Sequence, residues 1–186
     1  MSLSKVNIRK PKDSISLIFT VKQISKQCQS LGKLLTQQKM KLAVAESCTG
    51  GWLSSCIIDV PGSSNWFDRG FITYSNDSKV EQLSVNTQDL ATYGAVSEEV
   101  AQQMAQGVIQ HSHADYSIAI TGIAGPSGGT RTKPVGTVWF GWANKNTQYS
   151  QCCHFFGNRE LIRHQAVITA LKYLRNFIKD ESTTDY

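Results

Sequence analysis

Apolar residues follow two different periods along this chain, one typical of helices and the other of buried strands. Between Val21 and Gln38 they recur three or four positions apart, which predicts a first helix. Helical patterns and helix start signals predict four more helices, at Gly50–Ile58, Asn76–Leu83, Ser97–His111 and Arg159–Ile178. β-Branched and aromatic residues predict strands at Lys41–Ala45, Gly70–Tyr74, Tyr116–Thr121, Val135–Ala143 and Gln148–Phe156. The alternation of helices and strands indicates an α/β fold.

Two local signals add detail to this layout. Ser97 precedes Glu98 and Glu99, so a hydroxyl cap followed by acidic residues marks the start of a helix. The segment from Asn144 to Thr147 separates two predicted strands closely enough for a hairpin, which makes part of the sheet antiparallel.

The length of 186 residues suits one well-buried domain. Residues 1–20 carry turn formers and charge without a sustained helical period, so we expect a flexible N-terminal extension. We expect residues 21–179 to form the single domain and residues 180–186 to form a C-terminal tail.

The charge distribution does not indicate a nucleic-acid-binding protein. The net charge is +5, and the one dense basic cluster lies near the N-terminus, at Lys5, Arg9, Lys10 and Lys12. Nucleic-acid binding also calls for basic residues interleaved with stacking aromatic residues, and the sequence has no such array. We interpret the cluster as part of a solvated tail.

The cysteines and the apolar runs indicate a cytoplasmic protein. The five cysteines show no spacing typical of a zinc site or a disulfide framework, so we expect reduced thiols. No stretch is long enough to span a membrane. The short apolar stretch Ser14–Val21 lacks the cleavage site of a signal peptide.

The candidate chemistry begins at Ser47, which follows the first predicted strand in the motif AESCTGG. Ligands bind at this edge of open α/β sheets, and N–H groups at a helix start can hold an anion. Either Ser47 or Thr49 only caps the next helix, or Ser47 is a nucleophile beside an oxyanion hole. The N–H groups of that oxyanion hole would belong to Cys48, Thr49, Gly50 and Gly51.

A base within reach of Ser47 would separate these two interpretations. None of the four histidines follows a predicted strand, and His111 and His113 have no third ligand at a suitable spacing, so we predict no metal site. A better partner is Lys79, one turn beyond the strand that ends at Tyr74. A lysine acts as a base when burial or a nearby positive charge lowers its pKa, and Tyr74 would position it or relay the proton. Periodicity alone still favours a solvated helix lysine.

A loop rich in glycine, proline and hydroxyl residues follows the third predicted strand, in the sequence TGIAGPSGGTRTKP. Such loops can fold their N–H groups around phosphate, although no Gly-Lys-Ser/Thr follows as in a Walker A motif. A flexible surface loop is the alternative.

Several motifs in order identify a family. These are AESCTGG, DVPGSSNWFDRGFITYSNDSK, YGAVSEEVA, TGIAGPSGG, KPVGTVWFGWA and GNRELIRHQAV. Together they resemble the CinA C-terminal domain family, which includes nicotinamide mononucleotide deamidases, over about Val21 to Phe177. The resemblance implies a three-layer α/β/α sandwich around a mixed, mostly parallel sheet.

The resemblance also implies an activity. It implies hydrolysis of the carboxamide of nicotinamide mononucleotide, a small-molecule substrate, to nicotinic acid mononucleotide and ammonia. By motif, Ser47 would be the nucleophile, Lys79 the base and Tyr74 its helper. The residues expected to contact the nucleotide are Thr121, Gly122, Gly125 and Arg159, of which Arg159 would pair with the phosphate or form an ion pair at the helix start. The base is a side chain, so the chemistry requires no cofactor.

The sequence departs from the family pattern in two places that bear on function. Longer members carry another N-terminal domain, where this chain has only a short basic extension. Asn158 stands where an aspartate is more common, which removes a charge beside Arg159. Exposed-looking aromatic residues such as Trp66 and Phe67 favour a homo-oligomer, although core packing would also explain them.

Other functions stay open from the sequence. Cys48 at a helix start is an alternative nucleophile, although no histidine is placed to assist it. A catalytically silent paralogue would keep the nucleotide-binding fold for a regulatory or binding role. An amidase acting on a related pyridine nucleotide would have the same motifs.

Overall fold

The computed structural model describes residues 6–7 and 15–184, with the side chains of residues 22–179. The strands are β1 (Val6–Asn7), β2 (Leu42–Glu46), β3 (Phe67–Ile72), β4 (Tyr116–Gly122), β5 (Thr137–Ala143) and β6 (Gln148–His154). The helices are α1 (Ile15–Gln38), α2 (Trp52–Ile58), α3 (Asn76–Leu83), α4 (Thr87–Tyr93), α5 (Glu98–Gln110) and α6 (Arg159–Thr184), with a 3-10 turn, η1 (Ser63–Asn65).

The strands form one six-stranded sheet in the order β1-β6-β5-β4-β2-β3. β2 pairs in parallel with both β3 and β4, and β1 pairs in parallel with β6. β5 is antiparallel to its two neighbours, β4 and β6. The mixed, mostly parallel α/β sheet is therefore confirmed.

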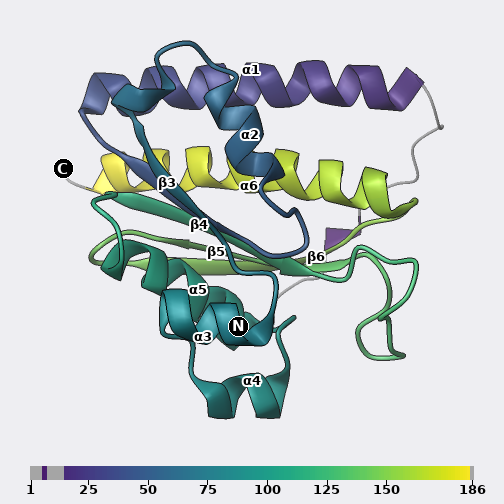
Figure 1. Ribbon diagram of the computed structural model, residues 1–186. Helices are drawn as coiled ribbons and strands as arrows, with labels where there is room; N and C mark the ends of the chain where they lie inside the picture. The colour runs from purple at the N-terminus through teal and green to yellow at the C-terminus, as the bar shows by residue number, and fades with distance from the viewer. Residues whose placement is uncertain (1–5, 8–14, 185–186) are drawn as a thin grey trace.

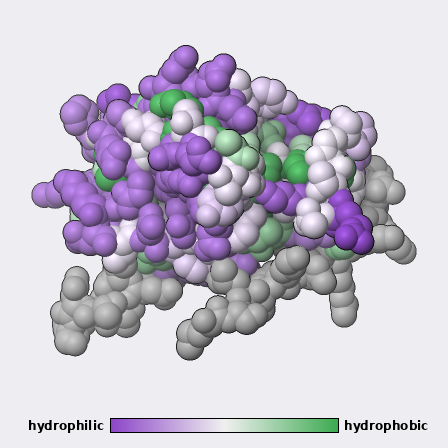
Figure 2. All heavy atoms as spheres, turned by 90° about the horizontal axis from the view of Figure 1, so that it is seen from below, coloured by the Kyte–Doolittle hydropathy of each residue, from purple (hydrophilic) through white to green (hydrophobic). Residues whose placement is uncertain are grey.

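Helices cover both faces of the sheet, so the molecule has three layers (Figure 1). α1, α2 and α6 lie on one face, and α3, α4 and α5 lie on the other. Seen from the side of α3, α4 and α5, the surface is covered largely by hydrophilic side chains (Figure 2). This is the expected pattern for helices that pack one apolar face on the sheet.

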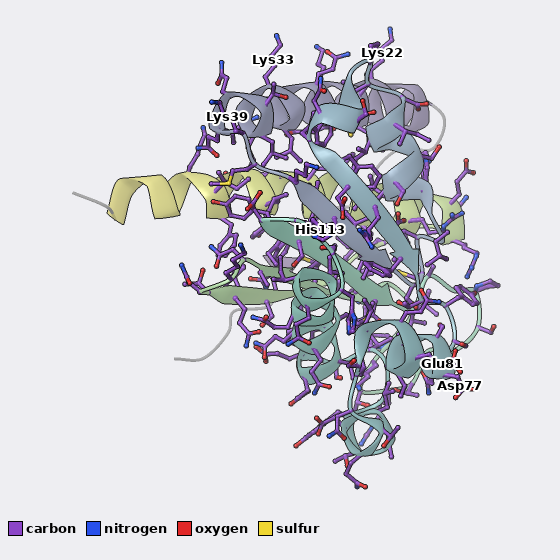
Figure 3. The ribbon with its side chains drawn as sticks, turned by 60° about the vertical axis from the view of Figure 1, so that its left-hand side comes forward. Lys22, Lys33, Lys39, Asp77, Glu81 and His113 are labelled. Atoms are coloured by element: carbon purple, nitrogen blue, oxygen red, sulfur yellow. The ribbon has the colours of Figure 1, made fainter. Side chains whose placement is uncertain are left out.

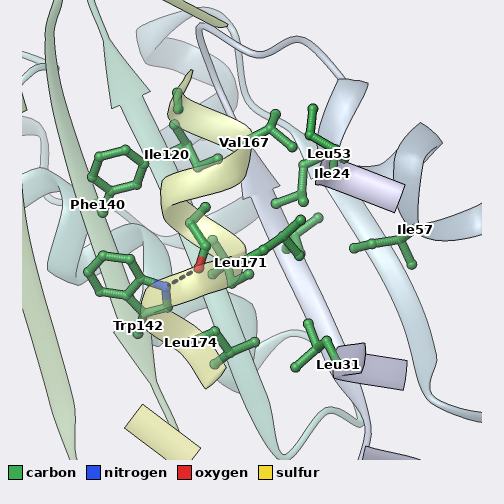
Figure 4. Close-up of a cluster of buried hydrophobic side chains, with 14 of the residues drawn as sticks. Ile24, Leu31, Leu53, Ile57, Ile120, Phe140, Trp142, Val167, Leu171 and Leu174 are labelled. Carbon is green, nitrogen blue, oxygen red and sulfur yellow. Dashed lines mark hydrogen bonds between the residues drawn. The ribbon is translucent and has the colours of Figure 1, made fainter. Parts of the chain in front are cut away.

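Each face of the sheet has its own hydrophobic core. The larger core lies under α1 and α6 and includes Leu31 of α1, Leu171 of α6 and Phe140 of β5 (Figure 4). The indole nitrogen of buried Trp142 donates a hydrogen bond to Ala170 O of α6 at 3.0 Å, so this large aromatic side chain has its polar atom satisfied. The smaller core lies under α5, around Met104.

Two predicted local features are confirmed. The Ser97 hydroxyl accepts a hydrogen bond from Val100 N, which is the expected cap of α5. The Asn144–Thr147 turn joins β5 to β6, with Asn144 N donating to Thr147 O at 3.0 Å. The side chain of Asn144 also accepts hydrogen bonds inside the turn.

Some predicted boundaries differ from the structure. α1 begins at Ile15 instead of Val21, and α6 continues to Thr184 instead of Ile178. The predicted extension therefore includes the first turns of α1 and the strand β1, and its remaining residues lie outside the described part of the chain, as do the last two residues of the predicted tail. The short helix α4 was not predicted.

Trp66 is a core residue and not a surface aromatic. Its side chain is 2% exposed and packs so closely on Gly32 of α1 that a Cβ there would lie 2.7 Å from the indole. Phe67 is half-buried against the same core. Core packing therefore explains both residues, and homo-oligomerisation stays a prediction.

The cysteines, the lengths of the helices and the lysines at α1 complete the description of the fold. All five cysteines are free thiols. Among the described helices, none combines the length and the apolar character needed to cross a bilayer. Lys22 and Lys33 on α1, and Lys39 directly after it, point away from the body of the molecule (Figure 3).

Candidate active site

The parallel strands β2, β3 and β4 end at the same edge of the sheet, and the candidate residues gather there. Ser47 directly follows β2, and its N–H donates to Ile120 O of β4 at 3.0 Å. Thr73 directly follows β3, and its N–H donates to Glu46 O at 2.9 Å. The ladder of backbone hydrogen bonds thus extends to both residues and fixes their main chain.

A tight turn over residues 47–51 leads from β2 into α2. Gly50 N donates to Ser47 O at 3.1 Å, and Gly50 and Gly51 have φ angles of 59° and 89°. A Cβ on Gly51 would also lie 2.9 Å from the Ile72 side chain. The second glycine of the motif is therefore required both by the backbone conformation and by the close approach of β3.

Glu46 anchors this turn from inside the protein. Its side chain is fully buried, and its carboxylate accepts hydrogen bonds from Leu53 N at 2.9 Å, from Ser54 N at 2.8 Å and from the Ser54 hydroxyl at 2.7 Å. The last strand residue thus satisfies N–H groups at the start of α2. Glu46 is not among the site residues predicted from the sequence, although a carboxylate just before a glycine turn and a helix is a signal for such a cap.

Lys79 approaches Ser47 from α3. Ser75 caps this helix by accepting a hydrogen bond from Ser78 N at 3.0 Å. Asp77 and Glu81 lie on the outer side of α3 (Figure 3), whereas Lys79 lies on the inner side and is 1% exposed. Residues two positions apart point to nearly opposite sides of a helix, so an exposed acidic face and a buried lysine are compatible.

The Lys79 amine ends among oxygen atoms at the strand ends. Its nitrogen lies 3.2 Å from Ser47 Oγ and 2.7 Å from Thr73 O, with Ser75 O and Tyr74 O at 3.3 and 3.4 Å. Burial lowers the pKa of Lys79 from 10.5 to about 8. A neutral amine is therefore accessible near physiological pH, within hydrogen-bond distance of a hydroxyl.

Tyr74 contributes to this arrangement through its main chain. Its side chain is 63% exposed, and its hydroxyl accepts a long hydrogen bond, 3.4 Å, from Arg159. Within the described residues, that hydroxyl contacts neither Ser47 nor Lys79. The structure brings together two of the three predicted catalytic side chains, those of Ser47 and Lys79. The third, that of Tyr74, lies on the exposed edge of the site beside Arg159 and Gly125, and this edge is called the rim below.

Arg159 joins three segments at the rim. Besides its contact with Tyr74, its guanidinium donates to Gly125 O at 2.9 Å. It begins α6, where Asn158 accepts a hydrogen bond from Leu161 N at 2.9 Å. Asn158 thus takes the position of a helix cap, which an asparagine can occupy as well as an aspartate.

The predicted nucleotide-contacting residues of β4 have structural partners. The Thr121 hydroxyl is buried and donates to Ala95 O at 2.8 Å. A Cβ on Gly122 would lie 2.7 Å from the side chain of Val138, so glycine is needed there for β4 to pair with β5. Gly125 presents its carbonyl group to Arg159.

The turn at Ser47 presents unpaired N–H groups. Those of Cys48, Thr49 and Gly51 donate no hydrogen bond to another residue within residues 22–179, whereas that of Gly50 is bonded to Ser47 O. Three of the four predicted oxyanion-hole donors therefore have no partner in another residue of this range.

The two alternative chemistries have little support in the described residues. Cys48 is buried, and burial raises the pKa of its thiol to about 12, so the reactive thiolate is strongly disfavoured. The ring of His111 shares a hydrogen bond of 3.0 Å with the Ser84 hydroxyl. No group of three or more metal-liganding side chains occurs among these residues.

Two neighbouring residues of α6, Arg163 and His164, also border the turn. Arg163 donates to Thr49 O at 2.7 Å and lies over the ring of Trp52, 5.4 Å from its centre. The His164 ring packs on the same indole, with ring centres 3.7 Å apart. Arg163 is not among the predicted site residues, because its partner is a backbone atom far away in the chain.

Comparisons with known proteins agree on one family. The family model of the CinA C-terminal domain matches residues 24–178. The nicotinamide-nucleotide amidohydrolase PncC of Enterobacter agglomerans is 48% identical over 152 residues, which cover 81% of this chain and 93% of that protein. The CinA-like protein of Endomicrobium trichonymphae is 47% identical over 144 residues, 77% of this chain, but the match spans only 34% of that longer protein.

Solved structures give the same result. The crystal structure of a CinA superfamily protein from Escherichia coli superposes with a TM-score of 0.81 and 38% sequence identity, over 92% of this chain and 95% of that one. With a family match over most of its length and close relatives of similar size, the chain belongs to the CinA C-terminal domain family.

Proposed function

We propose that this protein is an amidohydrolase that converts nicotinamide mononucleotide into nicotinic acid mononucleotide and ammonia. The observation that carries the proposal is the buried Lys79 amine 3.2 Å from Ser47 Oγ, at the carboxyl edge of a parallel sheet. The name of the amidohydrolase from Enterobacter agglomerans, which matches over nearly its whole length, supports the choice of substrate.

Ser47 is the proposed nucleophile and Lys79 its base. As the Ser47 oxygen bonds to the carboxamide carbon, the neutral Lys79 amine takes the hydroxyl proton. The carbonyl groups of Thr73 and Ser75 hold the other hydrogens of the amine, so its lone pair faces Ser47. The negative charge moves to the former carbonyl oxygen of the substrate.

The unpaired N–H groups of Cys48, Thr49 and Gly51 are the proposed donors to that oxygen. Loss of one such donor typically costs about 3 to 4 kcal/mol of transition-state stabilisation. Glu46 supports these donors by anchoring the start of α2, so its proposed role is to position the turn.

The tetrahedral intermediate then collapses to an ester of Ser47, which water hydrolyses. The bond between carbon and nitrogen breaks, and the Lys79 ammonium returns its proton to the leaving group, which departs as ammonia. Water attacks the resulting ester of Ser47, with Lys79 again accepting a proton. As the bond between the Ser47 oxygen and the carbonyl carbon breaks, the Lys79 ammonium returns that proton to Ser47, and the acid product ionises to the carboxylate.

The rim supplies the proposed contacts to the rest of the substrate. Arg159 there contacts the hydroxyl of Tyr74 and the carbonyl group of Gly125, which lies in the loop that follows β4. Tyr74 also supports Lys79 through its carbonyl group at 3.4 Å. Thr121 and Gly122 end β4 directly before this loop.

The test is product analysis with purified protein. Nicotinamide mononucleotide should yield equal amounts of ammonia and nicotinic acid mononucleotide, and related pyridine nucleotides offered in parallel should react more slowly. Cys48→Ala is the matched control, because the proposal gives its thiol no chemical role. Binding of the nucleotide without ammonia release would contradict the proposal and indicate a silent paralogue, and faster reaction of a related nucleotide would reassign the substrate.

A further inference from the structure

A pocket lies between α2 and α6, on the side of the turn that faces α6. Its volume is about 410 Å³, and it is lined by Gly50, Gly51, Trp52, Ser55, Glu160, Arg163 and His164. This volume is within the range typical of small-molecule sites. Because its lining includes the last two residues of the 47–51 turn, the pocket adjoins the segment that carries the proposed nucleophile.

Arg163 is a half-buried cation in this pocket without a carboxylate partner. The one ion pair within the described side chains joins Arg69 to Asp68, so no carboxylate lies within 4.0 Å of the Arg163 guanidinium. Its Nε atom is buried without a hydrogen-bond partner. Removing a cation from water is costly unless an anion or hydrogen bonds compensate for the lost hydration. The surroundings of Arg163 therefore favour an anionic ligand.

His164 gives an independent indication. Its side chain is only 3% exposed, and its Nδ1 atom has no partner. Buried polar atoms are almost always hydrogen-bonded, so an unpaired imidazole nitrogen beside a pocket points to a ligand. Ser55 adds an exposed hydroxyl from α2. Arg163, His164 and Ser55 thus offer groups that can bind an anion. The one carboxylate in the lining, that of Glu160, is exposed in the first turn of α6.

We propose that this pocket binds the phosphate of a phosphomonoester and, resting on the proposed function, that this is the phosphate of the nucleotide whose amide reaches Ser47. A guanidinium matches phosphate with two parallel hydrogen bonds, and a hydroxyl and an imidazole extend the same set. The pocket is larger than a phosphate group, which leaves room for part of the attached sugar.

Arg163 fits this role better than Arg159. Arg159 is exposed to solvent and already donates to Gly125 O and to the Tyr74 hydroxyl. Arg163 is less solvated and also holds Thr49 O at 2.7 Å, so a phosphate on its guanidinium would bind beside the proposed oxyanion donors. Phosphate binding and the geometry of the turn would then be coupled through a single side chain.

The test measures binding in a Ser47→Ala background, where the substrate is not consumed. Calorimetry compares nicotinamide mononucleotide with nicotinamide riboside, which lacks the phosphate. Ser55→Asp introduces a negative charge on the exposed side of the pocket and should weaken nucleotide binding about tenfold or more, through repulsion between like charges. It should leave riboside binding nearly unchanged, and Arg163→Gln should act in the same direction.

Matched controls separate this effect from general changes in charge or fold. Ser64→Asp adds the same charge at an exposed residue of η1, and Arg175→Gln removes an arginine from a distant part of α6, where it donates to Ser30. Neither should change the ratio of the two affinities. If Arg163→Gln fails to fold, Ser55→Asp decides the question, because it alters an exposed side chain.

Inorganic phosphate supplies the last comparison. It should compete with the nucleotide and lose affinity in Ser55→Asp. Phosphate that binds without competing with the nucleotide would overturn the assignment to the substrate, and so would an unchanged ratio of nucleotide to riboside affinity in both pocket variants. The proposed function fails separately, if wild-type protein releases no ammonia, because these affinities require no turnover.

Discussion

At the scale of single residues, the Lys79 nitrogen determines what chemistry the site can perform. It is removed from water, which favours the neutral amine, and it is surrounded by carbonyl oxygens, which hold it in place. A neutral amine that donates two hydrogens to carbonyl groups has its lone pair left for Ser47. This arrangement supports the proposed roles of Ser47 as the nucleophile and Lys79 as its base.

The first prediction concerns pH. Burial lowers the pKa of Lys79 to about 8, so below that pH the amine carries an extra proton and cannot accept one from Ser47. The value of kcat/KM for nicotinamide mononucleotide should rise about tenfold per pH unit below about pH 8 and level off above it. Steady-state kinetics across this range measure the profile. A value that falls as the pH rises towards 8 would be incompatible with a lysine base.

The second prediction concerns Tyr74. Tyr74→Phe keeps the carbonyl group that contacts Lys79 and removes only a hydroxyl that contacts Arg159. We expect kcat to change by less than about tenfold, whereas loss of a proton-transfer group typically costs a factor of about 100 to 10,000. Measured kcat and KM distinguish the two roles. A loss in the larger range would restore the proton relay considered from the sequence.

The residues of the site differ in how far sequence could predict them. Ser47 and Lys79 could be predicted as site residues, because both follow strands that end at one edge of a sheet. The direction of the Tyr74 side chain could not be predicted, because it depends on the conformation of the main chain beyond β3. Arg163 was not predicted, because it donates to the main-chain carbonyl group of Thr49. Every residue type carries such a group, so the sequence does not indicate which one binds an arginine.

At the scale of elements, the junction of β2 and α2 positions the site. Glu46 ends β2 with a buried carboxylate that holds two N–H groups of α2, and the two glycines make the turn between them. Strand, turn and helix are thereby one unit, and the unpaired N–H groups of the turn are held in place before a substrate arrives. Preorganisation of this kind is what an oxyanion hole requires.

The third prediction tests that junction. Glu46→Gln replaces one acceptor oxygen by an amide group that faces N–H donors, and leaving such buried groups unsatisfied costs about 1 to 3 kcal/mol. We expect a loss of stability of that size in urea unfolding and a fall in kcat as the turn loosens. Glu81→Gln, on the outer face of α3, is the matched control and should change neither. Wild-type stability and kcat in Glu46→Gln would remove its positioning role.

Element types were more predictable than their ends. The bounds of α3 match the prediction because Ser75 caps it and Leu83 ends its apolar pattern. β3 begins earlier than predicted, since Asp68 and Arg69 look like loop residues but lie on the outermost strand of the sheet. α4 was missed because seven residues are too few for a clear period, although Asn86 provides a cap.

At the scale of the whole molecule, the site draws on all three layers. Lys79 comes from the α3 layer, Ser47 from the sheet, and Arg159 and Arg163 from the α6 layer on the opposite face (Figure 1). The fold therefore brings the proposed base, Lys79, to one side of the turn and two arginine cations to the other. The burial of Lys79 also makes the free energy of unfolding depend on pH.

The fourth prediction follows from that consequence. The pKa of Lys79 is about 8 in the folded protein and near 10.5 in the unfolded chain, so between these pH values the unfolded chain binds more protons. The contribution of Lys79 to wild-type stability should rise from about pH 8 to about 10.5 and be constant below pH 8. Lys79→Met lacks this group, so its stability relative to wild type should decline over the same interval. Unfolding by urea at several pH values measures the difference, which should not stay constant.

The central claim is that Ser47 and Lys79 act as one catalytic unit on nicotinamide mononucleotide. The most direct measurement is the rate of ammonia release by wild type, Ser47→Ala, Lys79→Ala and the double variant, after each is shown to be folded. Residues that work as a unit are strongly non-additive, so each single variant should lose a factor of about 1,000 or more in kcat and the double variant little beyond that. Ser47→Ala with activity near that of wild type, or a double variant with fully additive losses, would contradict the account.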